Sequence, residues 1–466
     1  MTCVEQLAGF VSRASFDQLS PKARDQLKNA VLDALGCALG ALGAEAIRLI
    51  RAQVEEFGGA SLCTLIGGGR TAPDRAAFCN GALVRYLDFN DSFLAVGESC
   101  HPSDNLAPVL AAAEYANCSG RELLTALAVA YQVQCRLSEM APVRHKGFDH
   151  TTQGAYAVAG GVAKALGLTQ VQTANAIAIA GTAFNALRVT RTGALSHWKG
   201  LAYPNTAFGA AHAAFLARRG ITGPLEVFEG NKGFIETIAG PFELDWSKED
   251  LERVTKIILK KYNAEVHSQS AIEALLELKR EQPFGAPEVE RVELETFAVA
   301  HNIIGGGEEG DKTLVQTKEQ ADHSLQYILA VAILDGQVMP EQYSQERIQR
   351  PDVQKLLRKI SVRPSIELSR RFPNQMPVRL QVHLHGGRVL AREQDDYEGF
   401  HTRPMSWPTV VQKFERLSYS VSTAALRQEL VEAVANLDRI PATDLTDLLA
   451  QVRIGSASTH EERREA

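Results

Sequence analysis

Three short stretches of the sequence bring acidic, basic and imidazole side chains close together along the chain. The first contains Asp88 and Asp91 and continues into the run CHPSD at residues 100–104. If the acidic pair lies on a helical turn, its carboxylates, three positions apart, share one face. His101 and Asp104 then add an imidazole and another carboxylate, a combination suited to acid–base chemistry. Taken alone, His-Pro-Ser-Asp is also typical of a solvated turn with a capping side chain.

The second stretch places His150 at the start of a very apolar segment that we expect to be a helix. The N-terminus of a helix carries a partial positive charge, which favours the neutral imidazole that a general base needs. The alternative is an ordinary helix start, in which Asp149 or Thr151 provides the cap.

The third stretch contains three cations, Arg188, Arg191 and Lys199, beside glycine, serine and threonine. Guanidinium groups bind carboxylates through two parallel hydrogen bonds, and a lysine adds a point charge. Because Ala-rich segments flank this stretch, we interpret it as an anion site. The alternative is a basic surface patch.

Two further stretches each place a histidine beside polar groups. Residues 260–267 include Lys261 and His267, and residues 320–327 include His323. Either histidine could instead cap a helix or pack in a core. No zinc spacing, H-E-x-x-H sequence or nucleotide-binding glycine pattern is present, so we expect neither a metal nor a cofactor.

The elements that must position these residues change in character along the chain. Residues 1–57 and the Ala-rich residues 72–216 predict close-packed helices, one of them beginning at Ser20-Pro21. Alternating strand patterns then appear near residues 289–296, 356–365, 377–384 and 389–393, with helices at 322–335 and 345–357. We therefore predict a mainly α protein. It has a helical domain at 1–265, to which 405–450 returns, a smaller α+β lid domain at 266–404, and a charged flexible tail at 451–466.

Composition limits the function classes. Of the 466 residues, 45% are hydrophobic and 22% are charged, which excludes a disordered or fibrous chain. The net charge of −6 argues against nucleic-acid binding. No apolar run approaches the roughly 20 residues of a membrane helix, and no signal peptide is evident.

The seven cysteines include no C-x-x-C pair, which predicts thiols in a reducing compartment and gives no support to an iron–sulfur cluster. We expect a cytoplasmic protein without a membrane partner. A mitochondrial matrix location stays open, although no transit peptide is seen.

Five motifs in this order closely resemble the MmgE/PrpD family. They are LDFND at 87–91, CHPSDNL at 100–106, GFDH at 147–150, LSHWKG at 195–200 and ADHSL at 321–325. The resemblance covers about residues 5–450 and implies a helical domain with an α+β lid, usually as a homodimer, with the active site between the domains. By motif match this site would include Asp91, His101, His150 and Lys199, with residues 260–267 contributing from the hinge.

The family includes 2-methylcitrate dehydratase, cis-aconitate decarboxylase and a few epimerases. The resemblance implies a cofactor-independent hydro-lyase acting on a small tricarboxylate such as 2-methylcitrate or citrate. The run His-Pro-Ser-Asp-Asn is closer to the dehydratases, since the decarboxylases follow His-Pro with smaller residues. Decarboxylation of cis-aconitate and epimerisation remain alternatives. A non-enzymatic helical scaffold is disfavoured, because it has no need for these clustered polar groups.

Dehydration removes a proton alpha to a carboxylate and expels hydroxide. We expect Lys199, with Arg188 or Arg191, to hold that carboxylate while negative charge builds. His150 or His101 would be the base, and the general acid would be the other histidine, or Asp91 if burial raises its pKa. The expected substrate-binding set is Asp88, Asp104, Arg188, Arg191, Lys261, His267 and His323.

Overall fold

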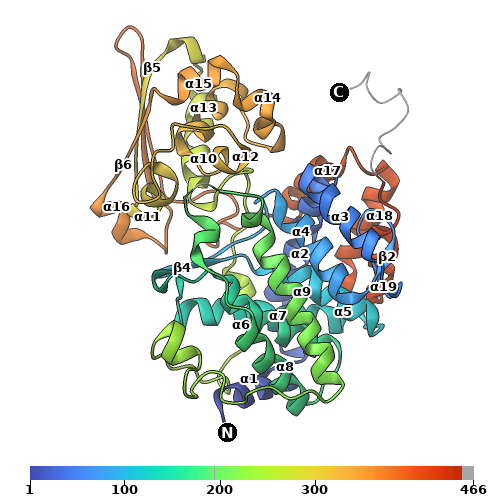
Figure 1. The fold of residues 1–466 in the computed structure, drawn as a ribbon. Coiled ribbons are helices and arrows are strands. Elements are labelled where there is room, and N and C mark those ends of the chain that lie inside the picture. The colour runs from blue at the N-terminus through green and yellow to red at the C-terminus, as the bar shows by residue number, and fades with distance from the viewer. Residues whose placement is uncertain (194, 454–466) are drawn as a thin grey trace. The chain divides into compact units, whose positions relative to one another are not determined.

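The computed structural model describes residues 1–193 and 195–453 (Figure 1). Helices make up 58% of the structure and strands 9%, so the prediction of a mainly helical protein is confirmed. Most of the predicted tail, at residues 454–466, lies outside the described residues.

The chain divides into two compact units. Unit 1 contains residues 1–190, residues 198–257 and the chain from Ser406 onward; unit 2 contains residues 191–197 and 258–405. The predicted boundary at 265/266 differs from this division, which assigns residues 258–265 to unit 2. A short piece around Arg191 also belongs to unit 2, although the chain on both sides of it belongs to unit 1.

Unit 1 is built from helices with many small side chains. Its helices are α1 (Cys3–Arg13), α2 (Pro21–Ala41), α3 (Glu45–Phe57), α4 (Pro73–Tyr86), α5 (Leu106–Tyr115), α6 (Gly120–Met140), α7 (Thr151–Ala165), α8 (Gln170–Ala183), α9 (Trp198–Arg218), α17 (Trp407–Ser418), α18 (Ala424–Ala435) and α19 (Ala442–Leu449). Ser20 caps α2 and Pro21 is its first residue, as predicted.

Helix α7 lies at the centre of this packing. It contacts α6, α8 and α9, and every one of its residues except Lys164 is buried. Alanine and glycine dominate its sequence, and such small side chains let neighbouring helices approach on several faces. The His150 side chain at its N-terminus is therefore held by a rigid element.

Two short hairpins complete unit 1. Strands β1 (Cys63–Thr64) and β2 (Arg70–Thr71) form one, and β3 (Phe93–Ala95) and β4 (Glu98–Cys100) form the other. The second hairpin separates Asp91 from His101 in sequence and returns the chain so that these residues meet.

Unit 2 contains a four-stranded sheet in the order β6-β5-β7-β8. Its strands are β5 (Val289–Thr296), β6 (Ile360–Pro364), β7 (Val378–Leu384) and β8 (Val389–Gln394). Strand β5 is parallel to β6 and antiparallel to β7, which is antiparallel to β8. The buried positions of β7 alternate with more exposed ones, as its sequence pattern predicts.

The helices of unit 2 cover this sheet and connect its strands. They are α10 (Gln269–Glu281), α11 (Ala298–Ala300), α12 (Lys318–Ala321), α13 (Leu325–Asp335), α14 (Gln345–Ile348), α15 (Pro351–Leu357) and α16 (Ile366–Arg371). Helix α10 packs on β7, β8 and α13. The predicted strand at 356–365 begins only at Ile360, because α15 continues to Leu357.

One local prediction is wrong. Helix α4 ends at Tyr86, and Asp88 adopts a left-handed backbone conformation with φ of 54°. Residues 87–92 therefore form a loop, and Asp88 and Asp91 do not share a helical face. Their carboxylates instead bind different partners.

No single helix in the described residues is long and apolar enough to cross a membrane; α2 and α3, bent by 90°, meet the length and composition criteria only as a pair. None of the seven cysteines, all of which lie in the described part of the chain, forms a disulfide.

Candidate active site

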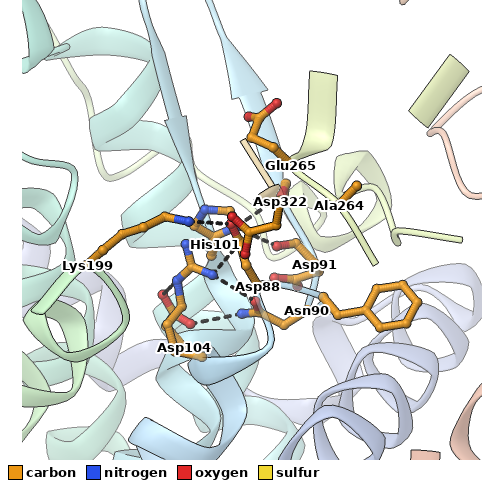
Figure 2. Close-up of polar contacts among 12 residues, drawn as sticks. Asp88, Asn90, Asp91, His101, Asp104, Lys199, Ala264, Glu265 and Asp322 are labelled. Carbon is orange, nitrogen blue, oxygen red and sulfur yellow. Dashed lines mark hydrogen bonds and ion pairs between the residues drawn. The ribbon is translucent and has the colours of Figure 1, made fainter. Parts of the chain in front are cut away.

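The loop after α4 carries a buried network of ion pairs. Arg85 donates to Asp88 Oδ1 at 2.5 Å, and Lys199 donates to Asp88 Oδ2 at 3.1 Å (Figure 2). The Arg85 Nε atom lies 3.7 Å from Asp104 Oδ2. These four side chains are at most 5% exposed and carry two positive and two negative charges.

Asn90 connects this network to the segment after β4. Its amide donates to Ser103 Oγ at 3.0 Å and to Asp104 Oδ1 at 2.9 Å. Ser103 and Asp104 belong to a short 3₁₀ turn, Pro102–Asn105, that leads into α5. The solvated turn considered from the sequence is thus ruled out, because the whole turn is buried.

Both carboxylate oxygens of Asp91 are occupied by protein donors. Oδ1 accepts from the main-chain N and the Oγ of Ser103, at 2.9 and 2.7 Å, and Oδ2 accepts from the Tyr131 hydroxyl at 3.0 Å. Burial raises the pKa of Asp91 to about 6, although the bonds from Ser103 and Tyr131 act in the opposite direction. A raised pKa was the condition for Asp91 to act as the general acid, but these three hydrogen bonds fit a carboxylate that holds neighbouring groups in place.

The imidazole of His101 is oriented by its Nδ1 atom. Nδ1 lies 2.8 Å from the main-chain oxygen of Asp91 and 3.0 Å from Ser92 Oγ. A carbonyl oxygen can only accept, so we assign the Nδ1 proton to this bond. In the neutral ring the lone pair then resides on Nε2, which is the arrangement of a general base.

His150 faces His101 across the site. Their ring centroids are 5.4 Å apart at an interplanar angle of 70°, and the Tyr203 ring stacks on His150 at 6.0 Å. His150 stands at the N-cap of α7, but its side chain makes no capping bond; Asp149 Oδ1 accepts the Thr151 amide instead. The two histidines named from the sequence are therefore brought together.

The three predicted cations have different carboxylate partners or belong to different units. Lys199 is buried in the first turn of α9 and binds Asp88, whereas Arg188 lies 3.9 Å from Asp149. Arg191, which is half-buried, belongs to unit 2. The chain from Arg191 to His197 is thus assigned to unit 2, between two segments of unit 1.

A second polar group lies in unit 2 around Glu265. This carboxylate accepts from the His267 main-chain N and lies 2.8 Å from His267 Nδ1. Burial would raise the pKa of Glu265, but His267, His323 and Lys260 lower it to about 2. Glu265 is therefore ionised at neutral pH and stabilises positive charge on its neighbours.

His323 has a carboxylate partner of its own. Its Nδ1 lies 2.6 Å from Asp322 Oδ1, and Lys318 binds Asp322 Oδ2 at 2.7 Å. The main-chain oxygen of Asp322 accepts from the Glu265 amide at 3.0 Å. Two stretches separated by more than 50 residues, 260–267 and 320–327, thus meet in one cluster.

Lys261 pairs with two carboxylates of unit 2. Its ammonium binds Glu273 and Glu398, each at 3.1 Å, and its side chain is 31% exposed. Arg403 also binds Glu273. Lys261 is thus held in a partly exposed ion-pair network, while the fully buried lysine of this segment is Lys260.

Sequence reasoning missed several members of both groups. Arg85 follows the helix-surface spacing i, i+3 toward Asp88, a signal that was available but is common on any helix. Tyr131 and Tyr203 lie within apolar helices, where nothing distinguishes them from core residues. Glu265 could have been found as the carboxylate two residues before a histidine, but such pairs are frequent.

Comparison with known families identifies the chain. The MmgE/PrpD N-terminal domain matches residues 5–247, and the MmgE/PrpD C-terminal domain matches residues 262–439. The protein belongs to the MmgE/PrpD family, and the resemblance stated from the five motifs is confirmed.

The chain is similar over nearly its full length to three relatives. It is 27% identical to a probable 2-methylcitrate dehydratase of Saccharomyces cerevisiae, covering 90% of this chain and 85% of the relative. It is 27% identical to a 2-methylcitrate dehydratase of Cupriavidus necator (95% and 96%). It is 24% identical to a cis-aconitate decarboxylase of Mus musculus (97% and 92%).

Proposed function

We propose that this protein is a cofactor-independent dehydratase of a small tricarboxylic acid of the 2-methylcitrate or citrate type. The observation that carries the proposal is the pair of buried histidines, His101 and His150. Their ring centroids lie 5.4 Å apart, and the Asp91 carbonyl orients the His101 ring. The names of the yeast and Cupriavidus relatives support a hydro-lyase.

In this proposal His101 Nε2 removes the proton alpha to a substrate carboxylate. The C–H electron pair forms the new C=C bond, and the neighbouring C–O bond breaks. The departing hydroxide receives a proton and leaves as water. Because the His101 Nδ1–H is held by the Asp91 carbonyl, the ring does not need to reorient before each turnover.

His150 is the proposed donor of the proton to the leaving hydroxyl. It faces His101, and Asp149 Oδ1 lies 3.8 Å from its Nε2 atom, close enough to stabilise an imidazolium. The Tyr203 ring limits the rotation of His150 by stacking on one face.

Negative charge on the substrate carboxylate grows as the proton leaves, and this must be stabilised by groups already in place. Lys199 is the proposed cation, with Arg85 behind it. Both cations bind Asp88, so this carboxylate holds them in place in the buried site and neutralises part of their positive charge. Arg188, whose side chain is 17% exposed, is a further candidate to meet a second substrate carboxylate.

A direct test is to mix the purified protein with 2-methylcitrate, citrate and cis-aconitate in separate assays, with and without a chelator. Dehydration of a hydroxy acid creates a C=C bond conjugated to a carboxylate, which is followed by its ultraviolet absorbance. We expect absorbance to rise with 2-methylcitrate and to be unaffected by the chelator. No product from either hydroxy acid would contradict the proposal.

The second candidate is decarboxylation of cis-aconitate, which the mouse relative favours. This reaction also develops negative charge beside a carboxylate, so the same cations and histidines could serve it. Release of CO₂ from cis-aconitate, with no turnover of 2-methylcitrate, would select this function.

A further inference from the structure

A buried lysine from the C-terminal part of the chain contacts the loop that carries the candidate site. Lys413 lies in α17 and is 8% exposed. Its ammonium donates to the main-chain oxygen of Phe89 at 2.8 Å and pairs with Asp33 of α2 at 2.7 Å. The ammonium also lies 3.6 Å from the centroid of the Phe89 ring.

The loop held in this way is residues 87–92. It contains Asp88, Asn90 and Asp91, whose side chains bind the groups described above, and its main-chain oxygen at Asp91 orients His101. The positive φ of Asp88 is a conformation that residues other than glycine adopt at a cost. A loop of this kind keeps its shape only when surrounding contacts hold it.

We propose that Lys413 is a positioning residue for the candidate active site, holding the loop 87–92 through the Phe89 carbonyl while Asp33 balances its charge. The expected effect of Lys413 on turnover rests on the proposed function, whereas its expected effect on the order of the loop does not. Lys413 lies within the residues matched by the C-terminal family domain, yet it belongs to unit 1. The return of the chain to unit 1 thus brings a cation to the site loop.

Asp33, the carboxylate partner of Lys413, also acts on the pKa of Asp91. The charge of Asp33 raises the pKa of Asp91 and also that of Tyr131, in addition to the larger effect of burial. The groups that face Asp91 are Ser103 and Tyr131 as donors and Asp33 as a like charge. Loss of the Lys413 ammonium would remove a positive charge beside Asp33, and the ionisation of Asp91 would become less favourable.

The experiment compares the wild type with a double variant, a rescue variant and a control variant. The single variant Lys413→Met is not used, because it would leave a buried carboxylate without its ammonium and could fail to fold. The double variant Asp33→Asn with Lys413→Met therefore replaces the ion pair by neutral groups of similar volume. Lys413→Arg keeps the charge and tests rescue.

Lys28→Met is the matched control. Lys28 lies on α2, the helix that carries Asp33. Like Lys413, it binds one carbonyl and one carboxylate, here from the C-terminal part of the chain: Ala435 O at 2.8 Å and Asp438 at 2.5 Å. Neither of these groups belongs to the loop 87–92. A general loss of packing between α2 and the C-terminal helices would appear in both variants.

Two measurements decide the outcome. Amide hydrogen exchange should be at least about tenfold faster in residues 87–92 of the double variant, and unchanged there in Lys28→Met and Lys413→Arg. Turnover of 2-methylcitrate should fall at least about tenfold in kcat in the double variant alone, because misplaced groups slow the chemical step. Unchanged exchange in the loop, or an equal change in the Lys28 variant, would overturn the proposal. If the wild type turns over no substrate, the proposed function fails, and the exchange measurement still tests Lys413.

Discussion

The Nδ1 atom of His101 lies 2.8 Å from the main-chain oxygen of Asp91, ten residues earlier in the chain. The hairpin of β3 and β4 makes this contact possible, because it turns the chain back between the two residues. The Asp91 side chain meanwhile holds Ser103, just beyond His101, through two hydrogen bonds. Asp91 therefore fixes the His101 ring through its main-chain oxygen and the following turn through its carboxylate.

Replacement of His101 should abolish most activity without unfolding the protein. His101→Gln retains a polar side chain but removes the basic nitrogen, so we expect turnover of 2-methylcitrate to fall about 10²-fold or more. Circular dichroism and the melting temperature should change little. His145→Gln, at an exposed position, is the control and should remain active. Near-normal turnover in His101→Gln would remove this residue from the mechanism.

Replacement of Lys199 should also reduce turnover about 10²-fold, because it removes a preorganised cation. Lys199→Met leaves Asp88 bound to Arg85, so the fold should survive. The control is Lys232→Met, at a lysine whose side chain is 73% exposed. Steady-state kinetics should show the loss mainly in kcat. A variant with raised KM and normal kcat would assign Lys199 to substrate binding alone.

The raised pKa of Asp91 makes a prediction about the pH dependence of stability. An aspartate in the unfolded chain has a pKa of about 4, whereas burial raises the pKa of Asp91 in the folded protein to about 6. Between these values the folded protein holds a proton that the unfolded chain has lost. The unfolding free energy contributed by Asp91 therefore falls as pH rises from about 4 to about 6, and is constant above that range.

Asp91→Asn should remove this contribution, which amounts to about 3 kcal/mol for a shift of about two pH units. Urea unfolding at several pH values should show a flatter profile for Asp91→Asn than for the wild type. Asp17→Asn makes the same chemical change at a side chain that is 80% exposed and should leave the profile unaltered. Identical profiles for all three proteins would show that Asp91 does not titrate in this range.

Two glycines of α7 provide a matched test of the packing behind His150. A Cβ atom at Gly154 would lie 2.4 Å from the Tyr203 ring, whereas one at Gly160 would meet its nearest neighbour, Val11, at 3.5 Å. Gly154→Ala must displace Tyr203, which stacks on His150, and should destabilise the protein by about 1–3 kcal/mol and reduce turnover. Gly160→Ala should be neutral or stabilising, because alanine favours helix. Thermal unfolding and kcat measured together would check both; equal behaviour of the two variants would contradict the prediction.

Residue patterns predicted the helical class, the four sheet strands and the helix that begins after His150. They succeeded there because periodicity records which side chains must be buried. They failed at residues 87–91, where the spacing of two aspartates suggested a helical face. The backbone instead leaves the helix at Tyr86, and Asp88 adopts a positive φ that no periodicity records.

Five motifs in order were enough to assign the family from the sequence and to name the chemical groups of the candidate site. How those groups combine followed from the folded structure. It paired Lys199 with Asp88 across 111 residues and Lys413 with Phe89 across 324. Such pairing of buried charges depends on distances set by the packing of whole helices, which local sequence does not encode.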